Sequence, residues 1–438
     1  LSDFDTNNIV IKESMVEPLT VSEILCTTLS KYLADSEDVM IPCESAYLEK
    51  MVQGNEQYIL YHSEEQKELQ SILYTLIDVF GTDILNTGEK SVVIKDINTE
   101  NLILNLETKE KVKESKILQA TLSHYITDSK DTGLIIPADN AILNPMEIIG
   151  FDGLKNVIEA NELDSLLDSC FQLFGEGDTL KVNEIKSEHV MIDKEKIKHI
   201  TNSKIMNTTI MDSMLNDEDL IVPAVENRIV EINQLMDPNL TCVIVEKDEI
   251  DYLLNSLIDM IGTDGVIDAS AIQISHIHIT SSIDVSRSEI LSATLGNKIL
   301  GVDEFDIPRE CVLSSVTVLS KKANSGTKDL INVDDLSQLL DSIFCLVNEL
   351  NIDSGQSDLN MDDIVFTKDN IPTILSSVIL EYHFRKNVCR WYLHSKSIGC
   401  CNFKRILWKR CSRVYYFRRN VKFMGSYICS WKYRFYFN

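Results

Sequence analysis

The sequence predicts a helix-rich α+β protein, built as a tandem array of small helix-strand-helix-strand repeats of about 87 residues. Three landmarks recur in one order along the chain of 438 residues. The first is a Ser-[Glu/Lys]-Ile-[Leu/Met] run, and the second is an Ile-Pro or Val-Pro pair. The third is an acidic residue followed by Leu or Ile at the start of an apolar helix. Recurrence of several landmarks at one spacing is typical of repeat architectures.

The landmarks set the expected boundaries of the repeats. The serines, the prolines and the acidic residues of successive copies are Ser22, Ser115, Ser203 and Ser288, then Pro42, Pro137, Pro223 and Pro308, then Glu68, Glu162, Glu249 and Asp335. Successive prolines are 95, 86 and 85 positions apart. We therefore expect residues 1–14 to end a preceding repeat or linker, four repeats at 15–107, 108–195, 196–280 and 281–365, and a truncated fifth repeat at 366–438.

The first expected helix of each repeat follows the serine landmark. In the second copy the span 114–127 places its apolar residues on one face of a 3.6-residue helix, with Lys116, Gln119 and Ser123 on the other. A short strand, Leu134 to Ile136, should come next. Pro137 would lie at its edge or just beyond it, because proline cannot donate to a sheet.

The second expected helix runs from Glu162 to Phe174 and ends at Gly175. Glycine suits the left-handed residue that closes many helices. Gly81 and Gly262 occupy the same position in the first and third copies, and Asn351 replaces glycine in the fourth. Segments beyond this point, such as 91–94 and 271–274, are expected to form half-buried strands.

The last stretch, residues 381–438, has a different composition. It holds all three tryptophans (Trp391, Trp408 and Trp431), five of the eleven cysteines and 14 of the 41 lysines and arginines, but Glu381 is its one acid. Clustered bases and aromatics suggest nucleic-acid binding, and Cys400, Cys401, Cys411 and His394 suggest zinc. We reject both interpretations because the genetic code offers a simpler one.

The tail is better explained by a disrupted reading frame. Trp391 to Cys401 admit codons that, read one nucleotide forward, spell an Ile-Pro pair with its proline at position 395, which is 87 after Pro308. The following residues then admit an acidic helix start and a Gly-Asn helix stop. Because the run Ser377 to Leu380 is still a fifth copy of the serine landmark, the disruption is placed between about Ile379 and Phe384. We expect residues from about 381 onward to be poorly packed, with exposed tryptophans.

Composition bounds the partners of this chain. Without residues 381–438, 27 bases face 67 acids, a formal net charge of −40 in place of −27. A surface this acidic repels nucleic-acid phosphates and anionic membranes. No apolar run reaches the roughly 18 residues of a membrane span. We expect a protein partner or neighbouring repeats, no nucleic acid and no membrane insertion within this segment.

The cysteines before the tail do not recur in register. A disulfide framework would place them at one position in each repeat, so they are interpreted as core thiols. They are Cys26, Cys43, Cys170, Cys242, Cys311 and Cys345.

Three candidate sites were weighed against structural roles. His276 and His278 have a spacing that zinc sites use, but a bulge near Ser275 would turn both toward solvent. The acidic turns 128–133 and 353–363 lack the ligand spacing of a calcium loop. The landmark serine is followed six residues later by a threonine, and no histidine recurs to activate either hydroxyl. The serine is expected to face solvent or set a helix start, and the threonine to pack on the helix.

These patterns predict a noncatalytic protein with no catalytic, cofactor-binding or metal-binding residues and no cofactor. We expect a spacer or protein-binding module from a longer bacterial surface or secreted chain, of which this sequence is a fragment. The composition, rich in Ile, Asn, Lys, Asp and Glu, indicates an AT-rich genome and favours a bacterial source. One alternative is a cytoplasmic scaffold, which free cysteines favour. Another is a metal-binding or enzymatic domain whose site residues occur once, such as His276 and His278.

Overall fold

The structure is a computed structural model of the whole chain. It describes residues 9–394, apart from 36–38, 43–47, 54–55, 62–65, 98–101, 129–131, 138–141, 150–153, 216–219, 224–228, 234–240, 273–276, 280, 302–304, 314–315, 319–325, 348–349, 354–355, 358–366 and 368. The architecture below is that of these residues.

The chain folds as a helix-rich α+β protein with short antiparallel strand pairs, which confirms the predicted fold class at this level. The helices are α1 (Glu13–Val21), α2 (Glu23–Asp35), α3 (Gln66–Phe80), α4 (Leu106–Glu114), α5 (Lys116–Asp128), α6 (Ala160–Phe174), α7 (Ile197–Asn202), α8 (Lys204–Leu215), α9 (Lys247–Ile261), α10 (Ser282–Arg287), α11 (Glu289–Gly301), α12 (Val333–Val347), α13 (Ile371–Ile374) and α14 (Val378–His394).

The strands are short, and most of them pair with one antiparallel neighbour. They are β1 (Val10–Lys12), β2 (Ile41–Pro42), β3 (Leu48–Gln53), β4 (Glu56–Tyr61), β5 (Ser91–Val93), β6 (Ile103–Asn105), β7 (Ile142–Ile149), β8 (Leu154–Ile158), β9 (Thr179–Lys181), β10 (Met191–Asp193), β11 (Ile229–Asn233), β12 (Thr241–Val245), β13 (Val266–Asp268), β14 (Ile277–Ile279), β15 (Val316–Val318), β16 (Gly326–Lys328), β17 (Leu350–Asp353) and β18 (Gln356–Ser357).

Two kinds of strand pair recur along the chain, the first nested inside the second, and β2 also pairs with β7. Hairpins join neighbouring strands, as in β3–β4, β7–β8, β11–β12 and β15–β16. Longer connections bring together β1 with β5, β6 with β9, β10 with β13 and β14 with β17, each around the helices that lie between the two strands. The pairing of β1 sets Val10 opposite Val93 and Lys12 opposite Ser91. Each connected segment is thereby closed by its own first and last strands.

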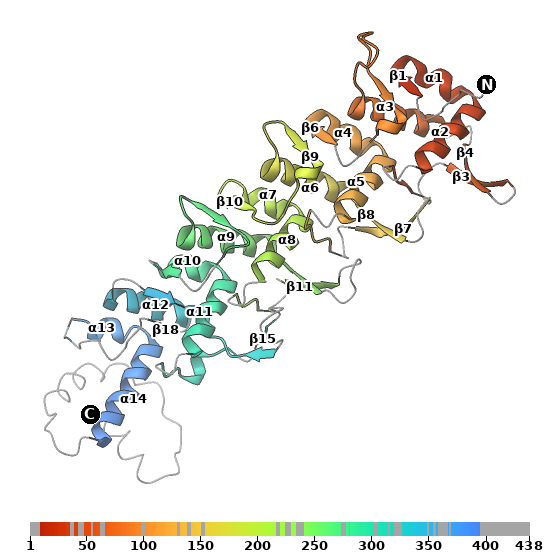
Figure 1. The fold of residues 1–438 in the computed structure, drawn as a ribbon. Coiled ribbons are helices and arrows are strands. Elements are labelled where there is room, and N and C mark those ends of the chain that lie inside the picture. Colours follow the sequence, from red (N-terminus) through yellow and green to blue (C-terminus); the bar gives the residue numbers. More distant parts are fainter. Residues whose placement is uncertain are drawn as a thin grey trace.

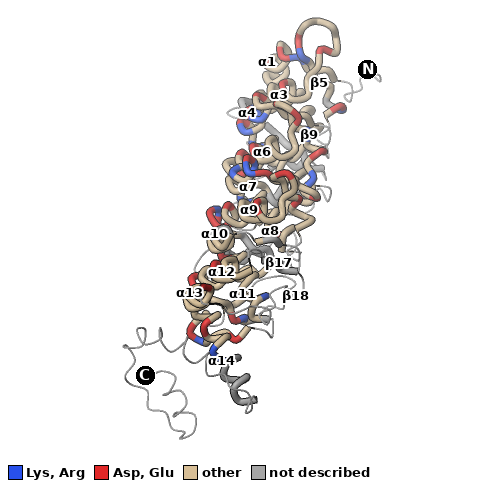
Figure 2. Tube along the Cα trace, turned by 90° about the vertical axis from the view of Figure 1, so that its left-hand side faces the viewer, with Lys and Arg blue, Asp and Glu red and all other residues tan. Residues whose placement is uncertain are grey.

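The elements follow one another along the long axis of an extended body, from α1 at one end to α14 at the other (Figure 1). A single large hydrophobic core runs through it and includes residues from Ile11 to Phe384. Segments close in sequence therefore share one continuous apolar interior. Figure 2 shows acidic residues along the helical side from α7 to α13, with basic residues beside α4 and α7.

The helix α6 illustrates how the apolar pattern sets the packing. Leu163, Leu166, Leu167 and Cys170 are fully buried, and they recur at the spacing of one helix face. The helix α4 begins at a capping box, in which the Asn105 side chain accepts the Thr108 N–H while the Thr108 side chain accepts the Asn105 N–H. The predicted helix from Glu162 to Phe174 is confirmed, with two further residues at its start.

Several predicted strands and helix ends are wrong in detail. Leu134 to Ile136 do not form a strand, because the Ile135 N–H donates to the Thr209 hydroxyl on α8 instead of to a sheet partner. Ala271 and Ile272 also lie outside strands, and the next two residues fall outside the described part. The fourth predicted helix stop, Asn351, lies within β17 opposite His278. The prediction of a strand at 91–94 is confirmed for Ser91–Val93.

The glycines that follow α3, α6 and α9 do not adopt the predicted left-handed conformation. Gly175 has φ −71° and Gly262 has φ −63°, both in the extended region. Glycine is needed there for space: a Cβ at Gly81, Gly175 or Gly262 would collide with the carbonyl oxygen four residues earlier in the helix. The left-handed glycines of the described part are Gly88, Gly133, Gly177 and Gly265, of which Gly177 and Gly265 lie in the turns just beyond α6 and α9.

The helix α14 carries the chain across the predicted frame disruption. His383 and Phe384 are 4% and 8% exposed, so the first residues after Leu380 pack into the body. Poor packing from residue 381 onward therefore does not hold for these residues. Residues 395–438 and the side chain of Trp391 lie outside the described part, and the disrupted frame stays a prediction.

Candidate functional site

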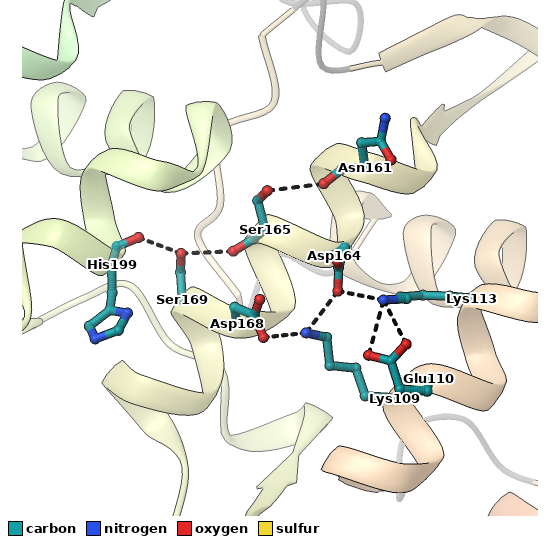
Figure 3. Close-up of polar contacts among 9 residues, drawn as sticks. All are labelled: Lys109, Glu110, Lys113, Asn161, Asp164, Ser165, Asp168, Ser169 and His199. Atoms are coloured by element: carbon teal, nitrogen blue, oxygen red, sulfur yellow. Dashed lines mark hydrogen bonds and ion pairs between the residues drawn. The ribbon is translucent and has the colours of Figure 1, made fainter.

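The densest polar cluster among the described residues joins α4 to α6 (Figure 3). Lys109 on α4 is 4% exposed and extends its ammonium between two carboxylates of α6. Its Nζ lies 2.7 Å from Asp164 Oδ1 and also forms an ion pair with Asp168. A buried lysine needs such partners because an uncompensated charge away from water is costly.

A second lysine extends this cluster toward solvent. Lys113 Nζ lies 3.1 Å from Asp164 Oδ1 and 2.8 Å from Glu110 Oε2. Lys109 and Lys113 are four residues apart on α4, as are Asp164 and Asp168 on α6, so each pair occupies one helix face. We call Lys109, Glu110, Lys113, Asp164 and Asp168 the α4–α6 ion cluster.

The contacts in the cluster favour the charged forms of Lys109, Lys113 and Asp164. Burial opposes the charge of Lys109, but its bonds to Asp164 and Asp168 outweigh burial and raise its pKa. The bond to Glu110 raises the pKa of Lys113. Burial would raise the pKa of Asp164, but the two ammonium groups outweigh burial and lower it. None of these groups is set up to exchange a proton near neutral pH.

A surface depression of about 280 Å³ lies beside the cluster. Its walls are Ser165, Asp168, Ser169, His199 and Asn202. The Ser169 hydroxyl has its acceptors in the main chain, at 2.6 Å from His199 O and 2.9 Å from Ser165 O. Because it does not bond to the imidazole, the pair lacks the geometry of an activated serine (Figure 3). Burial and the charge of Lys198 lower the pKa of His199. These polar contacts hold α6 against α4 and α7.

A second group of polar contacts occurs at the landmark serines, each of which begins a helix. Each hydroxyl accepts the N–H three residues later, at 3.2–3.4 Å, in the manner of a helix N-cap. These serines are Ser22, Ser115, Ser203, Ser288 and Ser377. The last four are completely buried. The prediction of a helix start is thus confirmed, and solvent exposure is wrong for these four.

Two of the serine caps also receive a carboxylate from the second helix before them, α6 for Ser203 and α9 for Ser288. Glu162 Oε1 accepts the Ser203 hydroxyl at 2.8 Å and the Ile205 N–H at 3.1 Å. Glu249 Oε1 makes the same two contacts with Ser288, at 2.7 Å, and with the Ile290 N–H, at 3.1 Å. Burial raises the pKa of both glutamates, and these hydrogen bonds oppose the shift. Each carboxylate satisfies the start of a helix that belongs to the next segment.

The threonine six residues after the serine connects to an earlier segment. Each buried threonine hydroxyl accepts the main-chain N–H of the residue directly before an Ile-Pro or Val-Pro pair, two residues before the proline, at 2.8–2.9 Å. The pairs are Met40 with Thr121, Ile135 with Thr209, and Ile221 with Thr294. In α14 the same position is His383, whose Nδ1 accepts the Asp306 N–H at 3.1 Å. Besides packing on the helix as predicted, the threonine thus bonds to the preceding proline segment.

The residues considered as metal ligands in the sequence lie largely outside the described part, so their prediction is not tested. His278 lies on β14 and His276 falls outside the described part. Within the described residues, no group of three His, Cys, Asp or Glu side chains is arranged to hold a metal ion. Much of the two acidic turns, and Cys400, Cys401 and Cys411 of the tail, also lie outside that part.

The predicted core thiols are confirmed at three positions. Cys26, Cys170 and Cys311 are free and buried, and burial raises the pKa of Cys170 and of Cys311 to about 12. Cys345 is exposed, which corrects its assignment to the core. The side chains of Cys43 and Cys242 are outside the described part.

Sequence reasoning missed the α4–α6 ion cluster. The signal available was the four-residue spacing of Lys109 and Lys113, and of Asp164 and Asp168. That spacing identifies two charged faces but does not show that they meet, because 50 residues and a hairpin separate them.

Comparison with known proteins gives no relative. No protein-family model matches the chain, and neither a curated protein nor a solved structure matches it. Among the described residues, none of the helices has the length and apolar character to cross a bilayer.

Proposed function

We propose that this chain is a noncatalytic tandem-repeat protein that serves as a spacer or protein-binding module. In this proposal the repeats at 15–107, 108–195, 196–280 and 281–365 are successive structural units, and the fifth begins at 366. The chain belongs to a longer bacterial surface or secreted protein. An acidic chain with an extended body suits both roles, because like charge keeps such molecules apart in solution.

The observation that carries the proposal is the recurrence of the same contacts at successive landmarks. A serine cap opens α5, α8, α11 and α14, and a threonine or histidine accepts an N–H from an earlier proline segment at each of these helices. These contacts join neighbours along the chain. Arrays stabilised by neighbour contacts are quasi-one-dimensional, and their length grows with the number of units.

The noncatalytic part of the proposal is supported by the hydrogen-bond partners of the recurring polar side chains. The hydroxyls that recur are donors or acceptors to the main chain, and the carboxylates that recur cap helices. The α4–α6 ion cluster occurs once and pairs its lysines with carboxylates. None of these hydroxyls, carboxylates and lysines is paired with a neighbouring base that would activate it as a nucleophile.

The array is tested by disturbing one boundary and following hydrogen exchange over the whole chain. Ile205 is fully buried at the start of α8, so Ile205→Asp should remove protection from α5 to α9. Helices α1 to α3 and α12 should keep theirs, because a repeat contacts its neighbours. Tyr252→Asp is the matched control, since Tyr252 is 47% exposed on α9. Equal loss of protection in every helix would contradict the proposal.

Spacer function is tested by small-angle X-ray scattering of the full chain. An extended particle of constant cross-section is expected, and a compact one would contradict a spacer. The surface assignment is tested by the nucleotide sequence across codons 375–438 and beyond, read one base forward. An open frame with the Ile-Pro pair and a later surface anchor supports it, whereas stop codons in that frame would make the basic tail authentic.

A further inference from the structure

The helix α2, which follows the first landmark serine, is more exposed to solvent than the helices that follow the later ones, α5, α8, α11 and α14. Ile24, two residues after Ser22, is 79% exposed. The isoleucines at the same place after the other landmark serines are fully buried; these are Ile117, Ile205, Ile290 and Ile379. Leu25 is 39% exposed, whereas the residues at its position in the other four helices are at most 4% exposed.

The polar groups of α2 show the same difference. The Thr28 hydroxyl donates to Ile24 O at 2.7 Å, as the later threonines do within their own helices. Those threonines also accept a main-chain N–H from the preceding proline segment, and in the described part of the chain no such N–H reaches Thr28. Ser22 caps Leu25 at 3.4 Å but is half-buried, whereas the later serines are fully buried.

The later boundaries show what covers this face. At α8 the cover is the helix that carries Glu162 together with the segment around Ile135, two residues before a proline. At α11 it is the helix that carries Glu249 and the segment around Ile221. Both covers come from the segment that precedes the covered helix in the sequence. A helix face of this kind is therefore covered by a carboxylate that accepts the serine hydroxyl, a main-chain N–H that donates to the threonine hydroxyl, and apolar side chains between them.

We propose that the exposed face of α2, formed by Ser22, Ile24, Leu25 and Thr28, docks one further unit of this chain's own kind, joined to the N-terminal side of β1. That unit supplies a carboxylate to Ser22, a main-chain N–H to Thr28 and apolar cover to Ile24 and Leu25. The inference rests on the proposed array. It adds that the unit containing α2 is an internal one, and that this surface is a docking site between units.

A second copy of the described chain would be a poorer occupant. The four N–H groups that lie two residues before a landmark proline already donate to Thr121, Thr209, Thr294 and His383. A second molecule would have to open one of its own boundaries to supply this donor. The helix α2 lies at the end of the extended body near β1, where a preceding unit could continue the axis (Figure 1).

The test extends the full chain by one unit. A second copy of residues 103–190 is joined directly to Val10. The copy then precedes β1 in the sequence as residues 103–190 precede β10. Hydrogen exchange of the α2 amides is compared between the parent and the extended protein. We expect exchange in α2 to slow by about tenfold or more, toward the rates of α8. Unchanged exchange in α2, with the added unit itself protected, would overturn the inference.

Two serine substitutions sharpen this test. In the parent chain Ile205→Ser should speed exchange in α8, whereas Ile24→Ser should leave α2 unchanged because Ile24 is already in water. In the extended protein Ile24→Ser should speed exchange in α2 as Ile205→Ser does in α8. If Ile205→Ser behaves as expected but the added unit never protects α2, the array stands and the docking inference fails. If Ile205→Ser leaves α8 protected, the array itself is wrong.

Two further measurements decide the case even if the extended protein does not fold. The coding sequence upstream of codon 1 should encode an Ile-Pro or Val-Pro pair and an acidic helix start at the repeat spacing. A start codon or signal sequence in their place would overturn the inference. Sedimentation of the parent chain over a range of concentrations should show a monomer. A dimer that Ile24→Ser abolishes would assign the face to a second copy and overturn it as well.

Discussion

Glu162 and Asp164 lie two residues apart on α6, yet their carboxyl groups are in opposite electrostatic environments. Glu162 meets a neutral hydroxyl and a main-chain N–H at the start of α8, and burial raises its pKa. Asp164 meets the ammonium groups of Lys109 and Lys113 on α4, which lower its pKa despite burial. One helix therefore places one carboxyl group against uncharged partners and another against two ammonium groups.

The difference follows the position of each contact in the chain. The Glu162 contact recurs one boundary later, between Glu249 and Ser288, and it lies in the core. In the next proposed repeat, Thr201 and Asp251 occupy the positions of Lys113 and Asp164, and these two also share a hydrogen bond. The serine–glutamate contact thus keeps its chemistry between these two proposed boundaries, whereas the contact between helices inside the proposed repeat is an ion pair in one copy and a hydroxyl–carboxyl hydrogen bond in the next.

The largest effect is expected from Glu162→Ala. The substitution leaves the buried Ser203 hydroxyl and the Ile205 N–H without their acceptor, which should lower the free energy of unfolding by about 2 kcal/mol. Urea unfolding followed by circular dichroism measures it. Glu188→Ala, at an exposed glutamate, is the control and should change stability by less than about 0.5 kcal/mol. Equal effects of the two substitutions would show that the carboxylate cap does not stabilise this boundary.

A smaller loss is expected from Lys109→Met on the other side of α6. The variant keeps the apolar stem but leaves Asp164 and Asp168 without their buried cation. Removing one partner of a buried pair is strongly destabilising, but both carboxylates are partly exposed and can regain water. We expect a loss of about 1–2 kcal/mol. Lys111→Met is the matched control, because Lys111 pairs with Asp78 at the surface with both side chains 40% exposed. Equal stability of Lys109→Met and Lys111→Met would show that the α4–α6 ion cluster does not hold the two helices together.

The features that sequence predicted well are those set by local chemistry and repetition. Ser203 before an apolar helix is a recognisable cap, and the apolar face of α6 follows from its spacing. The hairpins, such as β7–β8, were missed because their apolar runs are short, and the extra helix α7 is a turn and a half long. The reason for glycine at position 175 was predicted wrongly. A steric requirement and a left-handed conformation both select glycine, so the residue type alone does not distinguish them.

The candidate site was less predictable because its contacts are long-range. The Lys109 contacts join residues more than 50 positions apart, and the unit that follows has Ile197 in place of Lys109. Sequence shows charged faces but not which of them meet. The pairing of Ile135 with Thr209 was equally hidden, because the donor is a main-chain group that leaves no mark in the sequence.

The smallest predicted effect concerns pH, and here the two carboxyl groups of α6 should behave in opposite ways. The folded-state pKa of Glu162 is raised, so its contribution is fully present below the unfolded pKa and is lost as pH rises through the folded value. The folded-state pKa of Asp164 is lowered, so its contribution is present above the unfolded pKa and is lost as pH falls through the folded value.

Glu162→Gln and Asp164→Asn isolate these contributions, since each keeps the shape of the side chain. Relative to Glu162→Gln, the parent protein should lose stability as pH rises above the unfolded pKa of Glu162. Relative to Asp164→Asn, it should gain stability over the acidic range in which Asp164 ionises. Urea unfolding of the three proteins between about pH 3 and pH 7 gives both differences. Slopes of the same sign would mean that the two faces of α6 share one electrostatic environment, and the distinction between boundary and cluster contacts would fail.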